Sequence, residues 1–258
     1  MITFTDLIAD VAVAVLLYMT IIFVLSLLRK DNSVADVAWG FGFVVVAVYS
    51  VIQSGEADLR KMIVCTLVLL WGLRLSYHIM VRNSGKGEGL PYRTWRDTWK
   101  YFIPVSYFRI YILRGVFMLV ISAPVWFIGF RSGGPIGPWD SLGLLLFGAG
   151  FMIETYADYQ LAGFKRDPEN RGKILTKGLW SVSRHPNYFG EALVWWGIGC
   201  YTLSLPGGWM TLAGPAVITI LLRFFTGVPR AEKKMQDRPG WEEYKSKTAP
   251  FVPFMRFL

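Results

Sequence analysis

The sequence has few charged residues and no basic start, and both shortages restrict the kind of protein it can be. Charged side chains make up 17% of the 258 residues, whereas hydrophobic side chains make up 53%. Such a chain is too apolar for an ordinary soluble domain. The first ten residues contain no Lys or Arg, so the basic segment that opens a signal peptide is missing. We therefore expect an integral membrane protein whose first hydrophobic segment is retained.

Cysteine is also scarce, and the recognisable nucleotide motifs are absent. The two cysteines, Cys65 and Cys200, lie within apolar runs, where a thiol behaves as a small hydrophobic side chain. They give neither a disulfide framework nor the spacing of a metal site, so we expect no metal. The glycine-rich segment 82–95 is not a P-loop, because no Lys-Ser/Thr pair follows its glycines and no strand precedes it.

Long apolar runs make up most of the chain. We expect an all-α fold in which one membrane domain covers residues 1–258, with cap loops at 82–107 and 165–187 and a tail at 228–258. The aromatic and proline residues of the tail sequence APFVPF predict that it packs back on the helices. A transmembrane helix needs about 20 apolar residues. Seven segments qualify, at about 7–28, 34–52, 62–81, 108–129, 140–164, 188–205 and 209–227.

The connections between these segments differ strongly in charge. Twenty Lys and Arg residues lie in the first, third and fifth connections and the tail, against three, Arg60, Lys61 and Arg131, in the others. By the positive-inside rule this predicts an N-terminus outside and a C-terminus in the cytoplasm. The same asymmetry accounts for the net charge of +9, so we expect no nucleic-acid partner.

The second apolar segment carries a carboxylate near its cytoplasmic end. Asp36 shares a helical face with Trp39 and Phe43, by the i, i+3, i+7 spacing. Two interpretations stay open at this point. Either the carboxylate reaches water at the interface, or it takes part in chemistry.

The third segment contains a cation and an imidazole. Arg74 and His78 are four residues apart and share a face, with Trp71 one turn before Arg74 and Tyr77 beside His78. Charged groups at membrane depth normally face a partner or a water-filled cavity. Arg74 therefore either pairs with a buried carboxylate such as Asp36 or contacts a cofactor or substrate.

The fifth segment presents two carboxylates in one line. Glu154 and Asp158 lie four residues apart, and Lys165 follows two turns later. Like charges at this spacing destabilise a helix by a few tenths of a kcal/mol. Cations, or the donors of a ligand, are expected to offset this repulsion.

The loop before the sixth segment ends in Arg-His-Pro-Asn. The proline places Asn187 at the start of a helix, where free backbone N–H groups favour a negative ligand. Arg184 and His185 add side-chain donors, and Asn187, Glu191 and Trp195 repeat at every fourth position into the membrane. We expect an anionic ligand at this helix start; the alternative is a tight interfacial turn.

Several sequence blocks resemble a known family. The blocks ETYADYQLAGFK, KGLWSVSRHPNYFGEALVWWG, PRAEKKM and WEEYKSKTAPFVPF resemble the steroid 5α-reductase-like C-terminal domain. The segments DVAWGFGF and WGLRLSYHI extend the likeness to bacterial members. The resemblance implies a membrane reductase, in a bacterial inner membrane, that binds NADPH in a cytoplasm-facing cavity. It would reduce the activated C=C bond of a lipophilic, steroid-like enone.

The resemblance also implies site residues. Together with the donors of the Arg-His-Pro-Asn loop, it predicts that the cofactor is contacted by Arg74, His78, Asp158, Lys165, Arg184, His185, Asn187, Tyr188, Glu191, Trp195, Arg223 and Arg230. In the eukaryotic steroid reductases a Glu on the second span and a Tyr on the third hold the carbonyl oxygen. Here the second span has only Asp36, and Trp71 aligns with that tyrosine. We therefore expect Asp36 and Tyr77 as the catalytic polar pair beside Trp71, with Trp39, Phe43 and Glu154 near the substrate.

Two other functions are compatible with parts of the sequence. The Arg-His-Pro-Asn block and the Glu-rich tail are also similar to isoprenylcysteine carboxyl methyltransferases, which use S-adenosylmethionine. The reductase is favoured by the ETYAD block and by an excess of Arg and Lys suited to three phosphates. A transporter would show inverted repeats, and none is visible.

Overall fold

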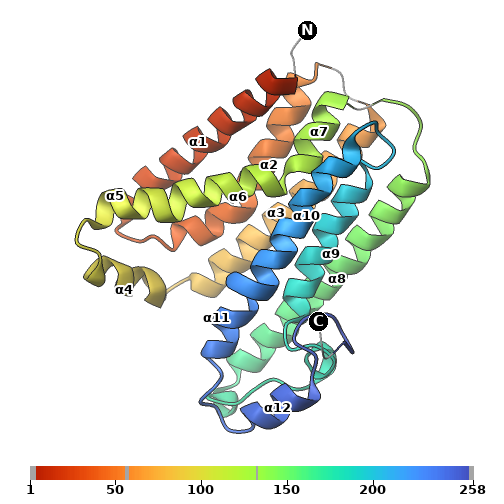
Figure 1. The fold of residues 1–258 in the computed structure, drawn as a ribbon. Coiled ribbons are helices and arrows are strands. Elements are labelled where there is room, and N and C mark those ends of the chain that lie inside the picture. The colour runs from red at the N-terminus through yellow and green to blue at the C-terminus, as the bar shows by residue number, and fades with distance from the viewer. Residues whose placement is uncertain (1–3, 56–57, 132, 256–258) are drawn as a thin grey trace. The chain divides into compact units, whose positions relative to one another are not determined.

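The computed structural model describes residues 4–55, 58–131 and 133–255, and it is helical throughout (Figure 1). Across these residues the only β-type pairing is an isolated parallel bridge between Ser183 and Ala249. The all-α prediction is therefore confirmed. The α-helices are α1 Phe4–Arg29, α2 Val34–Gln53, α3 Leu59–Asn83, α4 Leu90–Thr98, α5 Phe102–Ser106, α6 Leu113–Ile121, α7 Ala123–Arg131, α8 Pro138–Arg166, α9 Pro186–Cys200, α10 Ala213–Ile220, α11 Val228–Lys233 and α12 Trp241–Lys247.

Shorter helical turns connect or extend several of these helices. Two are π-helical, η1 Tyr107–Ile112 before α6 and η5 Leu221–Phe225 after α10. Three are 3₁₀ turns, η2 Pro168–Asn170, η3 Gly178–Ser181 and η4 Gly208–Leu212.

Five helical segments are long and apolar enough to cross a membrane, which makes the chain an integral membrane protein. They are Thr5–Arg29, Val34–Gln53, Leu59–Asn83, Phe102–Ile121 and Gly208–Lys233.

The predicted count of seven spans is not supported. The segment expected at 108–129 is interrupted after Ile121, close to Pro124, whose missing N–H cannot continue the helix bonding. The segment expected at 140–164 falls in α8, whose second half carries Glu154 and Asp158. The segment expected at 188–205 falls in α9, which has only 15 residues, fewer than the roughly 20 that a span needs.

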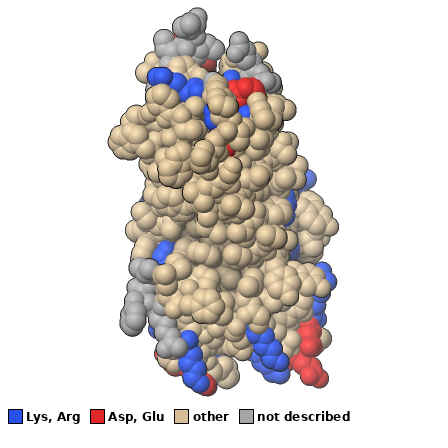
Figure 2. Space-filling model, turned by 90° about the vertical axis from the view of Figure 1, so that its right-hand side faces the viewer, with Lys and Arg blue, Asp and Glu red and all other residues tan. Residues whose placement is uncertain are grey.

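The surface is consistent with contact to lipid. On the face drawn in Figure 2, a broad area carries no charged side chain. Large apolar side chains such as those of Leu17, Leu28 and Leu145 are exposed. In water such exposure would be costly, whereas lipid tails are a suitable environment.

The described chain divides into two compact units. Unit 1 consists of Met1–Gly137 and Tyr201–Ala213, and unit 2 of Pro138–Cys200 and Gly214–Leu258. In unit 1, α2 and α3 pack backbone to backbone. A Cβ atom added at Gly72 would lie only 2.6 Å from the carbonyl oxygen of Gly40.

Unit 2 is organised around α8 and α9, which run side by side (Figure 1). Their backbones also touch at glycines, since a Cβ atom at Gly150 would lie 2.6 Å from the carbonyl oxygen of Gly190. At Gly190 an added Cβ would lie equally close to the backbone nitrogen of Glu154. This contact fixes the register of α8 against α9, and with it which of their polar side chains lie opposite each other.

Candidate functional site

The Arg-His-Pro-Asn segment begins α9 in unit 2 and is buried. Its start is fixed by the C-terminal tail: Arg184 N donates to Ala249 O at 2.8 Å, and Ser183 Oγ donates to Phe251 O at 2.7 Å. The hydroxyl of Ser183 in turn accepts from His185 N at 3.2 Å. The prediction that the tail packs back on the helices is therefore confirmed within unit 2.

The contacts that the structure gives Arg184 are internal ones. Its Nε donates to Glu232 Oε1 at 2.7 Å, and its Nη1 donates to the carbonyl oxygens of Lys245 and Thr248 at 2.8 and 2.7 Å. Three hydrogen bonds from a guanidinium that has five N–H groups leave little of it for a ligand. Arg184 therefore ties the start of α9 to α11 and to the end of α12.

His185 lies in the same cluster, where it is influenced by the negative charge of Glu232 and by the positive charges of two arginines. Its Nε2 is 3.4 Å from Glu232 Oε1, and its ring stacks on Tyr188 with 5.4 Å between centroids. Burial lowers the pKa of His185, and the opposing attraction of Glu232 does not outweigh it. The positive charges of Arg184 and Arg223 lower this pKa further. The neutral form of His185 is thus favoured by burial. Arg223 belongs to η5, which contacts α9.

Asn187 and Asp158, which the sequence predicted as cofactor contacts, are hydrogen-bonded to each other. Asn187 Nδ2 donates to Asp158 Oδ1 at 3.2 Å across the α8–α9 contact. The other amide atom, Asn187 Oδ1, is buried and accepts no hydrogen bond from any part of the chain that the structure describes. A buried acceptor without a donor costs about 1–3 kcal/mol. The arrangement suits a ligand that brings an N–H or O–H group to this point.

The remaining predicted residues of unit 2 differ in exposure. Three lie inside: Glu154, Glu191 and Trp195 are buried on the α8 and α9 faces. The cations lie further out, with Arg223 half-buried in η5, and Lys165 and Arg230 exposed at the ends of α8 and α11. On α8, the carboxylates of Glu154 and Asp158 are thus buried, and Lys165, two turns later, is exposed.

A second polar cluster lies in unit 1, around Asp36. Arg114 Nη2 donates to Asp36 Oδ1 and to the Tyr92 hydroxyl, both at 2.7 Å. Tyr92 in turn donates its hydroxyl proton to Asp36 Oδ1. Arg114 Nη1 is buried and donates no hydrogen bond to any of the residues described. The cluster thus joins a carboxylate, a phenol and a guanidinium with an unused donor.

This cluster differs from the catalytic pair expected from the sequence. Tyr77 is 65% exposed on α3, and the tyrosine that bonds Asp36 is Tyr92 on α4. Arg114 of α6 forms a salt bridge with Asp36. The spacing of α2 and α3 gave no sign of Tyr92, because Tyr92 lies on the short helix α4, 56 residues away from Asp36 in the chain.

The aromatic residues predicted near the substrate form part of the core of unit 1. Trp39 packs edge-on against Phe43 at 5.0 Å, and Phe43 packs against Trp71 at 5.5 Å. Phe43 and Trp71 are fully buried and pack against each other between α2 and α3. Arg74 and His78 are half-buried on α3.

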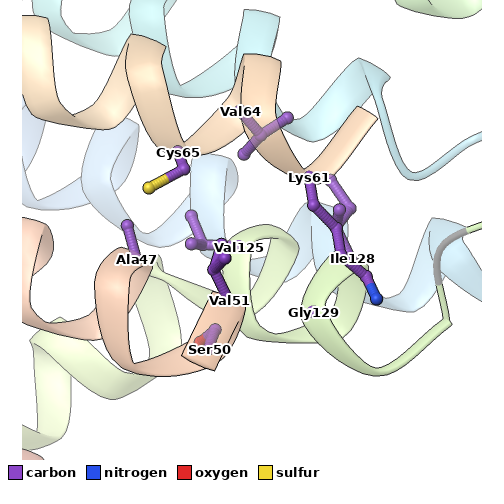
Figure 3. A pocket seen from close by; sticks show the side chains of 9 residues that line it. All are labelled: Ala47, Ser50, Val51, Lys61, Val64, Cys65, Val125, Ile128 and Gly129. Carbon is purple, nitrogen blue, oxygen red and sulfur yellow. The ribbon is translucent and has the colours of Figure 1, made fainter. Parts of the chain in front are cut away.

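A small cavity lies at the other end of α2, about 20 Å of helix away from Asp36 (Figure 3). Its volume is about 10 Å³, roughly the size that admits one water molecule. Such a space is far too small for a cofactor. It is lined by Ala47, Ser50, Val51, Lys61, Val64, Cys65, Val125, Ile128 and Gly129.

Metal-binding side chains are dispersed. Among the described residues, no three or more His, Cys, Asp or Glu side chains gather in a way that could hold a metal ion.

Comparison with known proteins gives two matches over most of the chain and several partial ones. The family described as "Protein of unknown function (DUF1295)" matches residues 22–248. An uncharacterized protein of Schizosaccharomyces pombe is 26% identical over 261 residues, which cover 88% of this chain and 74% of that protein. No solved structure matches the chain.

Two relatives have names that state an activity. The probable O-methyltransferase ustE of Ustilaginoidea virens is 30% identical over 125 residues, or 48% of this chain and 39% of its own length. The steroid 5-alpha-reductase DET2 of Gossypium hirsutum is 38% identical over 65 residues, or 25% of each chain. This chain thus matches less than half the length of either relative.

Proposed function

We propose that this chain, which belongs to the DUF1295 family, a steroid 5α-reductase-like family, is a membrane reductase that transfers hydride from NADPH to an activated C=C bond. The observation that carries the proposal is the unused, buried Nη1 donor of Arg114 beside the Tyr92 hydroxyl. Two adjacent donors of this kind suit the oxygen of an enone, on which negative charge develops during reduction.

The reaction needs charge stabilisation more than it needs a strong acid. When hydride adds to the β-carbon of an enone, the electrons of the C=C bond form a double bond between the α-carbon and the carbonyl carbon, and the electrons of the C=O bond move to the oxygen, which gives an enolate. One proton, ultimately from water, then adds at the α-carbon, and the C=O group is restored. NADPH, when bound, supplies the hydride, and the protein supplies the donors around the oxygen.

The residues around Asp36 have separate roles in this proposal. Arg114 donates from Nη1 to the substrate's oxygen, and the Tyr92 hydroxyl turns from Asp36 to the same oxygen. Asp36 accepts in both of its hydrogen bonds, so it orients Arg114 and Tyr92 and is not itself the donor. This revises the expectation that Asp36 donates a proton together with Tyr77.

Most of the cofactor residues that the resemblance implies lie in unit 2. The buried acceptor Asn187 Oδ1 would take a hydrogen bond from an N–H or O–H group of the dinucleotide. Arg223, Lys165 and Arg230 would contact its phosphates, since guanidinium and ammonium groups are the usual phosphate ligands. Asp158, His185, Tyr188, Glu191 and Trp195 would complete this side. Arg74 and His78 stay proposed contacts from unit 1.

The proposed location is a bacterial inner membrane with the cofactor residues facing the cytoplasm. Support comes from the resemblance to bacterial members and from the excess of Lys and Arg in one set of connections. The proposed substrate is lipophilic, because the enzyme is embedded in the membrane from which such a molecule would enter.

A methyltransferase is the second candidate, and a specific observation favours it. The partial match to a probable O-methyltransferase covers more of this chain than the match to the steroid reductase does. That function would require S-adenosylmethionine in place of NADPH. Either cofactor would meet the acceptor of Asn187, so the phosphate-binding cations are the feature that favours NADPH.

Thermal stabilisation of the detergent-solubilised protein separates the two candidates. A ligand that binds only the folded state raises stability by RT ln(1 + L/Kd), where L is its free concentration, so the shift grows with its concentration and affinity. We expect NADPH to raise the midpoint of unfolding more than NADH does, with no effect of S-adenosylmethionine. A shift with the methyl donor and none with NADPH would replace the reductase proposal with the methyltransferase.

A further inference from the structure

The starts of α2 and α4 in unit 1, including the two residues before each helix, are joined by hydrogen bonds between three pairs of residues. The two residues of each pair are 56 positions apart in the chain. The pairs are Asn32 with Glu88, Ser33 with Gly89, and Asp36 with Tyr92.

Glu88 makes the most hydrogen bonds at this junction. Its Oε1 accepts from Asn32 N at 2.9 Å, from Asn32 Nδ2 at 3.0 Å and from Arg96 Nη2 at 2.8 Å. Its Oε2 accepts from Arg96 Nε at 3.0 Å. The Glu88 side chain is 9% exposed, so these bonds are largely shielded from water. The two bonds from Arg96 form the bidentate geometry that gives such pairs their directionality.

The position of α4 depends on contacts of this kind. The helix has only nine residues, and its N-cap, Gly89, has no side chain to satisfy the first N–H groups. Isolated helices of this length are unstable in water, so tertiary contacts must hold it in place. Glu88 lies immediately before its start, and Arg96 lies in its last turn. One carboxylate thus fixes both ends of α4 against the start of α2.

Tyr92 lies one helical turn after Gly89, and Asp36 lies one turn after Ser33. Gly89 N donates to Ser33 Oγ at 2.7 Å. Because both helices advance by the same rise per residue, pairing at their starts determines which side chains face each other one turn later. A shift of α4 by one residue would move the Tyr92 hydroxyl away from Asp36.

We propose that Glu88 is a positioning residue that fixes the pairing of α4 with α2 and so holds Tyr92 against Asp36. This inference rests on the proposed function, in which Tyr92 donates to the substrate's oxygen. Glu88 itself does not touch the reacting atoms, since both of its oxygens already accept from Asn32 and Arg96.

The charges around the two side chains agree with this role. Burial opposes ionisation of Glu88, but hydrogen bonds from Arg96 and Asn32 outweigh it and lower the pKa of Glu88 to about 2. The carboxylate is therefore ionised at any working pH. Burial raises the pKa of Tyr92 well above its usual value; Arg114 opposes this rise, and Asp36 adds to it.

The test uses the ionisation of Tyr92 as a reporter that does not depend on activity. The full-length protein is labelled with ¹³Cζ-tyrosine in detergent, and the resonance of Tyr92 is assigned with Tyr92→Phe. We expect this resonance to show no ionisation up to about pH 11 in the parent protein, above the usual tyrosine value. In Glu88→Gln, α4 is released and Tyr92 begins to ionise below that pH.

The control and a milder variant keep the result interpretable. Glu243→Gln removes an exposed carboxylate paired with Lys247 and should leave Tyr92 unchanged. Arg96→Lys keeps the charge but loses the bidentate geometry, so a smaller shift in the same direction is expected even if Glu88→Gln fails to fold. Unchanged Tyr92 ionisation in both Glu88→Gln and Arg96→Lys would overturn the inference.

Turnover measurements separate this inference from the proposed function. Glu88→Gln should lower kcat by about tenfold or more while KM for NADPH stays the same, the loss expected when an acid group is misplaced. In a Tyr92→Phe background, Glu88→Gln should cause no further loss. If Glu88→Gln changes Tyr92 ionisation while Tyr92→Phe leaves turnover intact, Glu88 keeps its positioning role and the donor role of Tyr92 is wrong. A further loss in the Tyr92→Phe background would overturn the proposal that Glu88 acts through Tyr92.

Discussion

Arg114 and Asp36, 78 residues apart in the chain, form a salt bridge of 2.7 Å between α6 and the first turn of α2. The same guanidinium nitrogen also donates to the Tyr92 hydroxyl, so three helices meet at one polar point in unit 1. A polar cluster of this kind is costly within an apolar protein unless its groups satisfy one another. The donor left over on Arg114 is the reason to expect a ligand there.

Removal of the Tyr92 hydroxyl is expected to impair reduction. Tyr92→Phe should lower the rate of enone-dependent NADPH consumption by about 10²–10³-fold, as the loss of one oxyanion donor does elsewhere. Tyr101→Phe is the matched control, because that side chain is exposed and lies outside the cluster. Tyr77→Phe tests the sequence-based alternative. A large loss in Tyr77→Phe and none in Tyr92→Phe would show that the wrong tyrosine has been assigned.

Glu88 is expected to make the free energy of unfolding depend on pH in the acidic range. Its pKa is about 2 in the folded protein, against 4.5 as its ordinary value. A carboxyl whose pKa is lowered by folding stabilises the protein above the ordinary value and loses that contribution as pH falls toward the folded one. Glu88→Gln should therefore destabilise by about 1–3 kcal/mol at pH 7. The difference from the parent should shrink between about pH 4.5 and 2. Unfolding midpoints of the parent and of Glu88→Gln measure this. If the difference between them stayed constant from about pH 4.5 to about 2, the lowered pKa of Glu88 would be contradicted.

Arg184 is expected to act mainly on the attachment of the tail. Arg184→Ala removes three hydrogen bonds and leaves Glu232 without its cation, a change that costs about 3–5 kcal/mol for a buried pair. Amide hydrogen exchange of residues 241–255 should rise more than that of α8. Arg238→Ala, which loses one exposed bond to Lys173 O, is the control. Unchanged protection of the tail in Arg184→Ala would show that other contacts hold it.

The glycines between α8 and α9 provide a paired test of packing. Gly150→Ala should destabilise unit 2, because the added Cβ would lie 2.6 Å from the carbonyl oxygen of Gly190. Gly148→Ala on the same helix meets no atom within 4 Å and should stabilise by about 0.5–1 kcal/mol through helix propensity. Thermal unfolding should move in opposite directions for the two variants. Equal effects would mean that the helices pack differently from the structure described.

Asn187 is expected to contribute to NADPH affinity. Asn187→Leu removes the buried acceptor and should weaken NADPH by about tenfold or more, since one lost hydrogen bond of about 1.4 kcal/mol has that effect. Titration of NADPH against the unfolding midpoint measures the change. Lys173→Leu, in the exposed loop before η3, is a control outside the site. Equal NADPH affinity in the parent and in Asn187→Leu would remove Asn187 from the cofactor site.

The sequence predicted local relationships and missed those that depend on tertiary packing. The pairing of Asp158 with Asn187 follows from helical spacing on two segments joined by one loop, and the structure contains it. The pairing of Asp36 with Tyr92 was missed because α4 is a short helix in a glycine-rich loop, held in place by contacts from elsewhere. Nothing in the spacing of that loop indicates which of its residues turns inward.

The membrane segments show the same limit. Apolar runs identified α1, α2 and α3 to within a few residues, because length and hydropathy decide such segments. The same runs predicted α8 and α9 as membrane spans, although the polar residues of the proposed site interrupt their apolar pattern. The π-helical turns η1 and η5 follow from side-chain packing and leave no periodic signal.

The most direct test of the central claim is transfer of deuterium from NADPH that is labelled at the hydride-donating carbon. The purified protein in lipid nanodiscs is incubated with this cofactor and with a panel of lipophilic enones that includes a 3-oxo-4-ene steroid, and the products are analysed by mass spectrometry. We predict a product that carries one deuterium at the former β-carbon, formed by the parent protein and lost in Tyr92→Phe. Absence of deuterium transfer, with transfer of a labelled methyl group from S-adenosylmethionine instead, would contradict the reductase assignment.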